Sequence, residues 1–251
     1  MNTWNLIDTL YKERVLDREE LIFLFKNRGE EQASYLAELA RKQAQKIYGK
    51  NIFPRGLIEF TNYCRNNCYY CGIQASNKNI CRYRLSIKQI LSTCQNGYEL
   101  GYRSFVLQGG EDPYYSDERM VSIVEQIHQT YPDCAITLSL GERSLESYQK
   151  LHAAGGKRYL LRHETISPAL YQKLHPKKMS LEHRVQCLYD LQEAGFQVGT
   201  GFMVGAPYQT LEDLADDLLF IKKLHPQMVG IGPFVPHHDT IFRDFAAGTA
   251  E

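Results

Sequence analysis

The sequence predicts an α/β fold in which parallel strands alternate with helices and the sheet curls into a βα barrel. Three observations support this prediction. Short apolar runs alternate with amphipathic helical segments from residue 55 onward, which is the pattern of right-handed βαβ units. Each apolar run is followed by chemically unusual residues, as at the active-site rim of a parallel barrel. Hydrophobic residues make up 43% of the 251 residues, enough for one large core.

The individual elements follow from apolar periodicity and from capping residues. A helical extension is expected over residues 1–50, in which one helix begins at an Asp17 cap and stops at Gly29. The barrel domain follows over residues 51–251. Its expected strands are 55–60, 104–108, 135–140, 158–164, 196–204 and 228–234. Its clearest helices are expected at 86–100, 116–130, 143–154, 180–194 and 210–224.

A doubly wound open sheet is the alternative arrangement of alternating strands and helices. Such sheets usually carry a glycine-rich phosphate turn after the first strand. Here cysteines follow the first strand, which favours the barrel. Only six strands are expected, so we expect a C-terminally truncated (βα)8 barrel or a six-stranded partial barrel. The unpaired sheet edge would favour association or poor solubility.

Charge and cysteine content exclude several classes of function. The chain has 29 Lys and Arg against 29 Asp and Glu, so binding to nucleic acid or to an anionic membrane is not expected. No stretch approaches the roughly 18 apolar residues of a membrane span, and no signal peptide is recognisable. We therefore expect a cytoplasmic protein. Seven cysteines in that compartment indicate metal or redox chemistry rather than disulfides.

Three of these cysteines lie in the stretch TNYCRNNCYYCG, which follows the first expected strand. Three residues separate Cys64 from Cys68, and two separate Cys68 from Cys71. A [4Fe–4S] cluster normally takes four thiolates, so three in one loop would leave one iron open to another ligand. A structural zinc site is the alternative, with Cys81 as the fourth ligand. No second CxxC or HxxxH pair follows, which favours the iron–sulfur cluster.

The CxxxCxxC spacing, with Tyr70 just before the last cysteine, resembles the signature of the radical S-adenosylmethionine (SAM) superfamily. The resemblance implies a TIM-type barrel and a [4Fe–4S] cluster whose open iron binds the amine and carboxylate of SAM. It also implies that one electron from the cluster cleaves SAM to methionine and a 5′-deoxyadenosyl radical. Tyr70 would then belong to the SAM site.

Two glycine-containing segments match parts of the superfamily that hold SAM. GGED contains Gly109, Gly110 and Glu111 and resembles the GGE motif that meets the methionine ammonium. Glycines allow the backbone to approach a ligand closely, although an ordinary tight turn would have the same composition. GFMVG, which contains Met203, resembles the fifth-strand segment that lies against adenine.

Two charged residues complete the expected SAM site. Glu164, at the end of the fourth expected strand, is a carboxylate suited to holding the ribose or the ammonium. Arg184, early in the next helix, suits a bidentate grip on the methionine carboxylate. The simpler alternatives are a rim salt bridge for Glu164 and a solvated surface position for Arg184.

Longer strings narrow the resemblance to the HydE family of [FeFe]-hydrogenase maturases. They are VLQGGEDPYY, TLSLGE, RYLLRHET, LYQKLHP and MVGIGPFVPHHDT. Methylornithine synthase and biotin synthase share much of the pattern, but RHET and IGPF favour HydE. The resemblance implies a small-molecule or organometallic substrate, an iron species derived from cysteine. It further implies other hydrogenase maturases as partners and ferredoxin or flavodoxin as electron donor.

By the same resemblance, two arginines would face the substrate. Arg55 is expected on the first strand and Arg162 lies in RYLLRHET; the structural alternative is that both neutralise carboxylates inside the barrel. The chain departs from the family pattern at Tyr208, where Gly is usual, and at His238, where Pro is usual. Tyr208 would alter the shape of the loop beside adenine.

Cysteines outside the motif have a simpler interpretation. Those in apolar helix or strand contexts are expected to be small buried hydrophobes: Cys94, Cys134 and Cys187. Two functions other than a HydE-like role stay open at this point. One is a methylornithine synthase or another small-molecule radical SAM enzyme. The other, of a different class, is a protein that binds an iron–sulfur cluster or transfers electrons without SAM chemistry.

Overall fold

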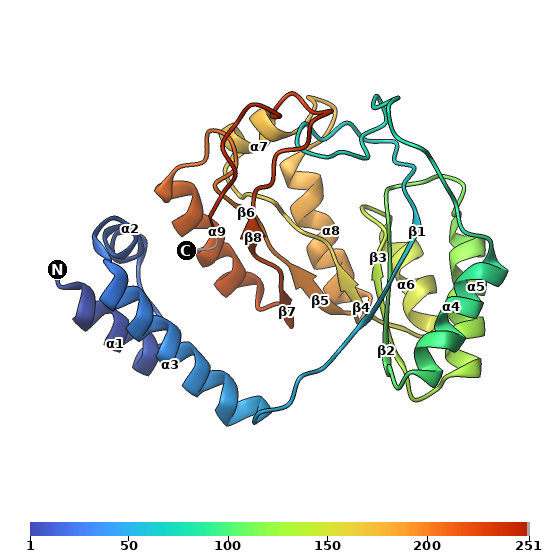
Figure 1. The fold of residues 1–251 in the computed structure, drawn as a ribbon, viewed down its shortest axis with the longest axis horizontal. Coiled ribbons are helices and arrows are strands. Elements are labelled where there is room, and N and C mark those ends of the chain that lie inside the picture. Colours follow the sequence, from blue (N-terminus) through green and yellow to red (C-terminus); the bar gives the residue numbers. More distant parts are fainter. Residues whose placement is uncertain (250–251) are drawn as a thin grey trace.

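The computed structural model describes residues 1–249 and contains a six-stranded parallel sheet (Figure 1). The last two residues of the expected barrel domain, 250 and 251, lie outside the described residues. The strands are β1 (Gly56–Thr61), β2 (Ser104–Gly109), β3 (Ala135–Ser139), β4 (Gly156–Leu160), β5 (Gln197–Thr200) and β7 (Met228–Val229). They pair in sequence order, and every neighbouring pair is parallel. This order confirms the α/β class built from consecutive βα units and lacks the reversal of a doubly wound sheet.

The fifth and sixth expected strands are each divided into two short segments. β6 (Met203–Val204) and β8 (Gly232–Pro233) form a separate parallel pair just beyond β5 and β7. At the break, a Cβ on Gly201 would lie 1.9 Å from the carbonyl oxygen of Gly230. Only glycine allows the two backbones to approach this closely. The predicted continuous strands over 196–204 and 228–234 are therefore corrected.

Helices cover the outer face of the sheet (Figure 1). The five predicted ones are α4 (Ile87–Glu99), α5 (Asp117–Thr130), α6 (Leu145–Ala153), α8 (Leu181–Glu193) and α9 (Leu211–Leu224). Each begins at a Ser or Thr whose hydroxyl accepts a hydrogen bond from a backbone N–H of the first turn. The short helix α7 (Pro168–Leu174) is absent from the sequence prediction, because seven residues give too little periodicity to reveal a helix.

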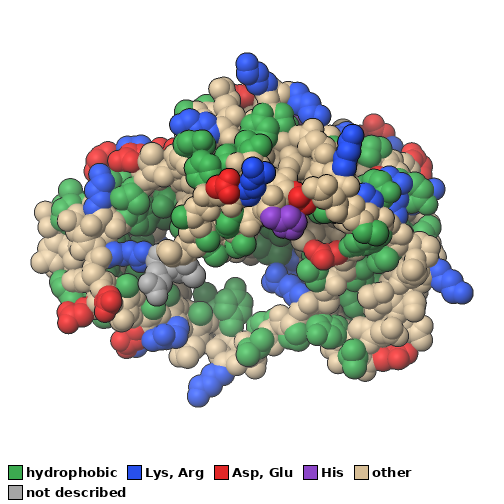
Figure 2. All heavy atoms as spheres, turned by 45° about the horizontal axis from the view of Figure 1, so that its top comes forward, with side chains coloured by type: hydrophobic (Ala, Val, Ile, Leu, Met, Phe, Trp, Pro, Cys, Tyr) green, Lys and Arg blue, Asp and Glu red, His purple; other side chains and the backbone are tan. Residues whose placement is uncertain are grey.

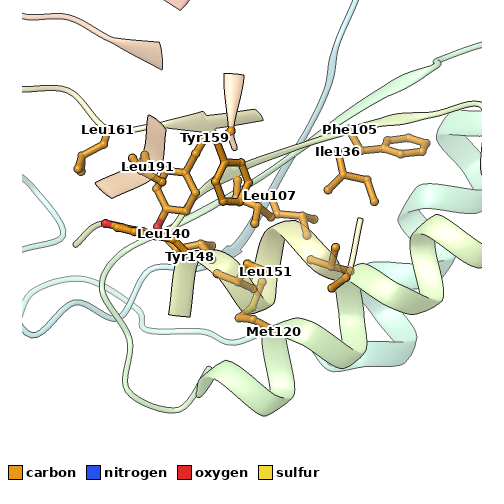
Figure 3. Close-up of a cluster of buried hydrophobic side chains, with 14 of the residues drawn as sticks. Phe105, Leu107, Met120, Ile136, Leu140, Tyr148, Leu151, Tyr159, Leu161 and Leu191 are labelled. Atoms are coloured by element: carbon orange, nitrogen blue, oxygen red, sulfur yellow. The ribbon is translucent and has the colours of Figure 1, made fainter. Parts of the chain in front are cut away.

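The main hydrophobic core lies between the sheet and the helices that follow its first strands (Figure 3). In β2, Phe105 and Leu107 are fully buried, whereas the alternate residues Val106 and Gln108 are only partly buried. This two-residue alternation is that of a strand with one face against a core. Tyr148 of α6 and Tyr159 of β4 belong to the same cluster. The less buried residues consequently face the concave side of the sheet.

Three helices precede the sheet: α1 (Thr3–Glu13), α2 (Arg18–Asn27) and α3 (Glu30–Tyr48). Asp17 caps α2 as predicted, through a capping box with Glu20. α2 packs against α9, where the Nε atom of Arg18 lies 2.7 Å from Oδ1 of Asp216. From α3 an extended segment leads back to β1, at the sheet edge opposite β7 (Figure 1). Within residues 1–249, every helix is too short or too polar to cross a bilayer.

Candidate active site

The loop after β1 lies at the carboxyl ends of the strands and carries the motif cysteines. These are Cys64, Cys68 and Cys71. Backbone hydrogen bonds fix the loop on two neighbours. The N–H of Tyr69 donates to the carbonyl of Leu174 at the end of α7, over 2.9 Å. The N–H of Arg65 donates to the carbonyl of Glu111 after β2, also over 2.9 Å. The cysteine loop is therefore joined to two other strand-end segments.

Arg82 sets the shape of the cysteine loop from within. Its guanidinium donates to four backbone carbonyls of the same loop: Asn62, Ile73, Gln74 and Asn77. A guanidinium offers five N–H donors in a fixed plane, so one side chain can hold several chain segments at once. The sequence analysis did not single out Arg82, because its partners are carbonyl groups that leave no pattern in the residue types.

The three motif thiols are half-buried, whereas Cys81 is exposed. Burial raises the pKa of Cys68 to about 12 and also raises that of Cys71. Buried thiolates of this kind need a cation to offset the cost of burial, and binding one releases protons. Three soft thiolates in one loop are a suitable ligand set for an iron–sulfur cluster.

Tyr70 lies among aromatic rings beside the cysteine loop. Its hydroxyl is 3.1 Å from Nε2 of His175, and the His175 ring stacks on Tyr171 with 4.0 Å between centroids. Burial lowers the pKa of His175 to about 4, so the ring is neutral at pH 7. Its Nδ1 lies 3.1 Å from the Tyr171 carbonyl oxygen, so Nδ1 carries the proton and donates to that carbonyl, and Nε2 accepts a hydrogen bond from the Tyr70 hydroxyl. Sequence reasoning missed both His175 and Tyr171.

Gly109 and Gly110 allow the chain after β2 to touch the cysteine loop. A Cβ on Gly110 would lie 2.2 Å from the carbonyl oxygen of Tyr63. A Cβ on Gly109 would lie 2.7 Å from Cγ2 of Thr61. The sequence analysis ascribed these glycines to close contact with a ligand. The structure shows close contact between two protein segments at both positions.

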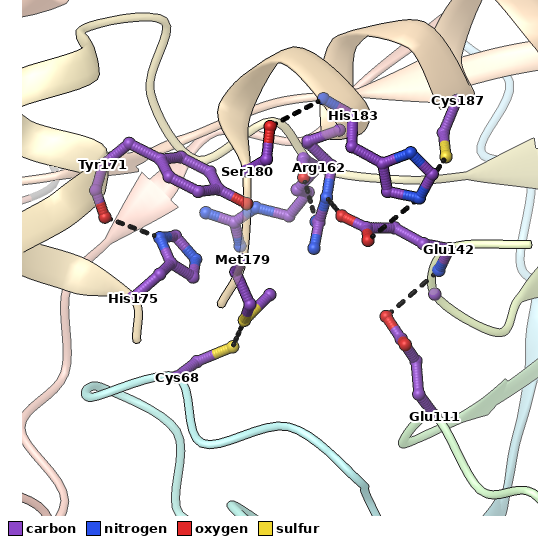
Figure 4. A network of polar contacts seen from close by, with 12 residues as sticks. Cys68, Glu111, Glu142, Arg162, Tyr171, His175, Met179, Ser180, His183 and Cys187 are labelled. Atoms are coloured by element: carbon purple, nitrogen blue, oxygen red, sulfur yellow. Dashed lines mark hydrogen bonds and ion pairs between the residues drawn. The ribbon is translucent and has the colours of Figure 1, made fainter. Parts of the chain in front are cut away.

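A chain of charged groups crosses the rim from β2 to α8 (Figure 4). One carboxylate oxygen of Glu111 lies 3.0 Å from Nε of Arg65, and the other accepts a hydrogen bond of 3.0 Å from the backbone N–H of Glu142. The Glu142 carboxylate pairs with the buried guanidinium of Arg184. Arg184 also donates to the carbonyl of Arg162 over 2.7 Å. Because Arg184 is only 7% exposed, the alternative of a solvated surface position is wrong.

Glu142 is a further residue that sequence reasoning missed. It lies just beyond the end of β3, behind Gly141, which has a φ of +78°. A Cβ on Gly141 would lie 2.1 Å from Cγ of Glu111, so glycine is required at this approach. The available signal was positional, because a carboxylate directly after a barrel strand lies on the same rim as the cysteines.

Glu164 combines backbone strain with unused hydrogen-bonding capacity. Its φ of +65° is left-handed, a conformation that costs a non-glycine residue about 1–3 kcal/mol. Its backbone N–H donates to the carbonyl of Gly201 over 3.1 Å. Its Oε2 lies 3.1 Å from Nη2 of Arg162, but the alignment makes no hydrogen bond, so both atoms lack a hydrogen-bond partner. Burial raises the pKa of Glu164. Such a group is suited to a ligand that supplies the missing partner.

The remaining predicted SAM residue, Met203, is buried in β6. Its carbonyl accepts a hydrogen bond of 2.8 Å from the side chain of Gln209. Farther along this loop, Tyr208 has a φ of +68°, the left-handed conformation that a glycine adopts without strain. Its ring is half exposed and meets Phe245 edge-on at 5.5 Å between centroids. The departure noted at Tyr208 therefore falls on a position that favours glycine.

Arg55 is not brought to this rim. β1 begins at Gly56, so the predicted place of Arg55 on the first strand is corrected to the position just before it. Arg55 thus lies at the amino ends of the strands, opposite to the cysteine loop. Together with Arg41 and Arg158 it lines a cavity of about 910 Å³ between α3, the extended segment and the sheet. Arg162, its expected partner in substrate binding, lies beyond the carboxyl end of β4.

Two sets of residues remain from the sequence analysis, the cysteines outside the motif and His238. Three cysteines are buried as expected: Cys94, Cys134 and Cys187. His238 is exposed and lies 3.2 Å from Oδ2 of Asp239, measured from Nε2. Asp239 also accepts hydrogen bonds from Asn77 and Asn79 of the cysteine loop. The segment that contains His238 is therefore joined to the cysteine loop through its neighbour.

The chain combines a parallel βα sheet with a three-thiol loop and a buried carboxylate–arginine network at one rim. These features are typical of one class of protein, the βα-barrel proteins that bind an iron–sulfur cluster beside a polar ligand. The model of the radical SAM superfamily matches residues 58–221. The chain belongs to the radical SAM superfamily. Membership implies the use of an iron–sulfur cluster and of SAM.

Several known proteins are similar to the chain. It is 47% identical to the [FeFe] hydrogenase maturase subunit HydE of Thermotoga maritima over 205 residues, covering 82% of this chain and 58% of that protein. It is 29% identical to the 3-methylornithine synthase of Methanosarcina acetivorans over 232 residues, covering 92% of this chain and 65% of the synthase. The chain therefore spans less than two thirds of the length of these two relatives.

Solved structures show the same architecture. The crystal structure of methylornithine synthase (PylB) matches 96% of this chain and 71% of its own, with a TM-score of 0.87 and 28% identity. The [FeFe]-hydrogenase maturase HydG from Carboxydothermus hydrogenoformans matches 99% of this chain and 60% of its own, with a TM-score of 0.81 and 26% identity.

Proposed function

We propose that the chain is a radical SAM enzyme that holds a [4Fe–4S] cluster through Cys64, Cys68 and Cys71. The observation that carries the proposal is the meeting of two features at one rim. Three half-buried thiols lie in a loop bonded to the GGE segment, and the carboxyl group of Glu164 and the guanidinium of Arg162 have atoms without hydrogen-bond partners. When bound, cluster and SAM would supply one-electron cleavage of the sulfonium and a 5′-deoxyadenosyl radical.

The residues at the rim divide the binding of SAM among them. Glu111 would face the methionine ammonium, and its orientation is fixed by Arg65 and by the N–H of Glu142. Arg184 retains donors beyond those given to Glu142 and to the Arg162 carbonyl, and these would bind the methionine carboxylate. Because the guanidinium is already held in place, little side-chain entropy is lost on binding.

The other side of SAM would meet Glu164 and the β6 segment. The unpartnered Oε2 of Glu164 would accept a hydrogen bond from the ribose or the ammonium, which would satisfy a buried acceptor. The backbone around Met203 would lie against adenine. Tyr70 would pack beside SAM. Its hydroxyl donates a hydrogen bond to neutral His175, which would keep it away from the reacting groups. Gly109 and Gly110 hold the GGE segment against the cysteine loop.

For the biological role we propose HydE-like maturation of [FeFe]-hydrogenase. The 47% identity to the Thermotoga maritima maturase supports it, as does the similarity to a HydG structure. The substrate would be a small molecule or a cysteine-derived organometallic iron species, with Arg162 pairing its anionic groups at the rim. Arg55, at the opposite ends of the strands, would not reach a substrate bound there. Other maturases and a ferredoxin or flavodoxin would be its partners.

A second candidate role is methylornithine synthase. The solved PylB structure supports it, because its TM-score of 0.87 over 96% of the chain is higher than the 0.81 of the HydG structure. The two roles share SAM cleavage and differ in substrate. Restored hydrogenase activity in cells that lack HydE would support the first role, whereas formation of 3-methylornithine would support the second.

The test of the shared chemistry is the production of 5′-deoxyadenosine. The protein is reconstituted with iron and sulfide without oxygen, reduced, and incubated with SAM, and the product is measured by mass spectrometry. Product is expected from the parent chain and from the matched variant Cys94→Ala, and none from Cys68→Ala. Full iron content without any 5′-deoxyadenosine would instead favour a protein that binds the cluster for electron transfer.

A further inference from the structure

Two segments, one of which contains the cysteine loop, are rich in basic residues, although the chain as a whole has no net charge. Residues 61–85 and 166–181 contain no Asp or Glu. Their basic residues are Arg65, Lys78, Arg82, Arg84, Lys173, Lys177 and Lys178. The chain as a whole has 29 basic and 29 acidic residues, so the rest of the molecule is net acidic. The positive charge is therefore a local feature that net charge conceals.

The two segments form one continuous surface over the thiols. The N–H of Tyr69 donates to Leu174, and Nζ of Lys178 donates to the carbonyl of Arg65 over 3.4 Å. The sulfur of Cys68 lies 3.8 Å from that of Met179 (Figure 4). Figure 2, which brings the top of Figure 1 forward, shows Lys and Arg side chains on this face. We call the exposed parts of residues 65–67, 76–79 and 176–179 the basic rim.

Three lysines of the basic rim are free to meet a partner. The other four Lys and Arg residues in the two segments are engaged within the chain: Arg65 with Glu111, Arg82 with loop carbonyls, Arg84 with Asp112 and Lys173 over the ring of Tyr208. Lys78, Lys177 and Lys178 are exposed, and within residues 1–249 none of them pairs with a carboxylate.

Carboxylates on the elements that pack against the basic rim offset these charges only in part, because Glu142 is already paired, whereas Asp239 and Glu182 bond to neutral donors and keep their charge. Glu142 pairs with Arg184, Asp239 accepts hydrogen bonds from Asn77 and Asn79, and Glu182 accepts one from Ser180. Glu142 and Asp239 are also largely buried. The outer side of the cysteine loop is thus positive and solvent-facing, whereas the proposed SAM groups lie on its inner side.

We propose that the basic rim docks an acidic one-electron donor protein, an inference that rests on the proposed function. In this step one electron passes from the reduced donor to the cluster site at the three cysteines. The donor is oxidised by one electron, and no bond forms or breaks. Opposite charges steer such encounters and raise association rates by about 10- to 1,000-fold, and the effect weakens with salt. The rim places this positive surface directly beside the thiols.

The experiment reverses two adjacent lysines, Lys177→Glu with Lys178→Glu. The matched control is Lys222→Glu with Lys223→Glu, an adjacent exposed pair at the C-terminal end of α9, away from the cysteine loop. An acidic flavodoxin is the probe. Its dissociation constant is measured at several salt concentrations, and the rate of cluster bleaching is measured with reduced flavodoxin and with reduced methyl viologen. Iron content is checked for each variant.

At low salt the Lys177→Glu, Lys178→Glu variant should bind flavodoxin about tenfold more weakly and be reduced by it about tenfold more slowly. Its reduction by methyl viologen should not fall, and the control pair should match the parent in both assays. Because Lys178 also donates to Arg65, the variant Lys78→Glu with Lys177→Glu repeats the test without touching that contact. It should lose flavodoxin binding to a similar extent.

Three results would overturn the docking proposal. They are unchanged flavodoxin binding, an equal loss in the control pair, or a rim that binds a uridine 20-mer but not flavodoxin. Failure of the proposed function is seen separately. In that case the parent chain would form no 5′-deoxyadenosine even when reduced methyl viologen supplies the electrons, whatever the flavodoxin result.

Discussion

At the carboxyl ends of the strands charged groups are buried and paired, whereas at the amino ends arginines line an open cavity that has no carboxylate in its wall. Glu142 and Arg184 form the buried pair, with side chains 12% and 9% exposed. At the other end, Arg158 donates to Gln197 over 2.9 Å, and Nη1 of Arg55 lies 3.9 Å from the sulfur of Met228. The same parallel strands thus support two different electrostatic environments.

The comparison shows that side chains are held in fixed orientations mainly at the carboxyl ends of the strands. Within residues 1–249, four non-glycine residues have a positive φ: Glu164 and Tyr208 lie on carboxyl-end loops, His225 lies in the loop before β7, and Arg14 caps α1. Strained backbone and buried charges reduce stability unless a ligand or partner compensates for them. At the amino ends, solvated arginines cost little and fix little. Substitutions at the two ends should therefore differ in size, and the predictions below use matched pairs to measure the difference.

The largest effect is expected from the motif thiols. Cys68→Ala should abolish cluster assembly, because two remaining thiolates hold a four-iron cluster poorly. Cys64→Ala and Cys71→Ala should do the same, whereas Cys94→Ala should retain the cluster. Iron analysis and EPR of the reconstituted, reduced protein make the measurement. Normal iron content in Cys68→Ala would remove that residue from the site.

The next effect compares arginines from the two ends. Arg184→Ala should destabilise the chain by about 3–5 kcal/mol, because the buried carboxylate of Glu142 loses its partner. Arg158→Ala removes a hydrogen bond to Gln197 near solvent and should cost no more than about 1 kcal/mol. Urea unfolding gives both values. The double variant Arg184→Met with Glu142→Leu should recover much of the stability lost in Arg184→Met alone. Equal losses of stability in Arg184→Ala and Arg158→Ala would contradict the proposed difference between the two ends of the strands.

Much of the fold was predictable because it is encoded in local periodicity. Strands with one buried face show two-residue alternation, and capped helices such as the one that starts after Ser86 show both periodicity and a boundary. The division of the fifth and sixth strands was not predictable, since it arises where Gly201 meets Gly230 across two strands. The helix α7 was missed because it is short.

The candidate site divides in the same way. The cysteine spacing lies within eight residues and could be read directly, whereas the pairs that organise the rim are far apart in sequence. Glu142 and Arg184 are 42 positions apart, and Tyr70 and His175 are 105 apart. Arg55 was misplaced because one position decides whether a residue lies in a strand or before it, and boundaries are the least certain part of a periodicity argument.

Smaller effects are expected at Glu164, where one substitution should weaken SAM binding but stabilise the SAM-free protein at neutral pH. Glu164→Gln should weaken SAM binding about tenfold, about 1.4 kcal/mol, by replacing a charged acceptor. Burial raises the pKa of Glu164 above its ordinary value near 4.5 in the folded chain, so folded protein binds more protons than unfolded protein in that window. The stability that this group contributes is therefore present below about pH 4.5 and is lost as pH rises through the folded pKa.

Urea unfolding of the parent and of Glu164→Gln between pH 5 and 8 checks the sign. The parent should lose stability relative to Glu164→Gln as pH increases, so that the variant is the more stable of the two at neutral pH without SAM. Titration with SAM, followed by EPR of the reduced cluster, gives the affinity. A parent that gains stability over the variant with rising pH would show that its carboxylate is satisfied within the chain.

An effect of similar size, on folding alone, concerns the backbone at Tyr208. Tyr208→Gly and Tyr208→Ala both remove the ring and its contacts with Phe245 and Lys173, so their difference reports the backbone alone. At a φ of +68° glycine should be the more stable by about 1–2 kcal/mol. Tyr114, which is also about half exposed but does not have a positive φ, supplies the matched control. There the order should reverse, with Ala more stable than Gly by about 0.5–1 kcal/mol, because glycine loses more conformational entropy on folding. Thermal unfolding of the four variants makes the comparison. If alanine were the more stable residue at both positions, the loop after β6 would have an ordinary backbone, and the carboxyl-end rim would store its strain at Glu164 and not at Tyr208.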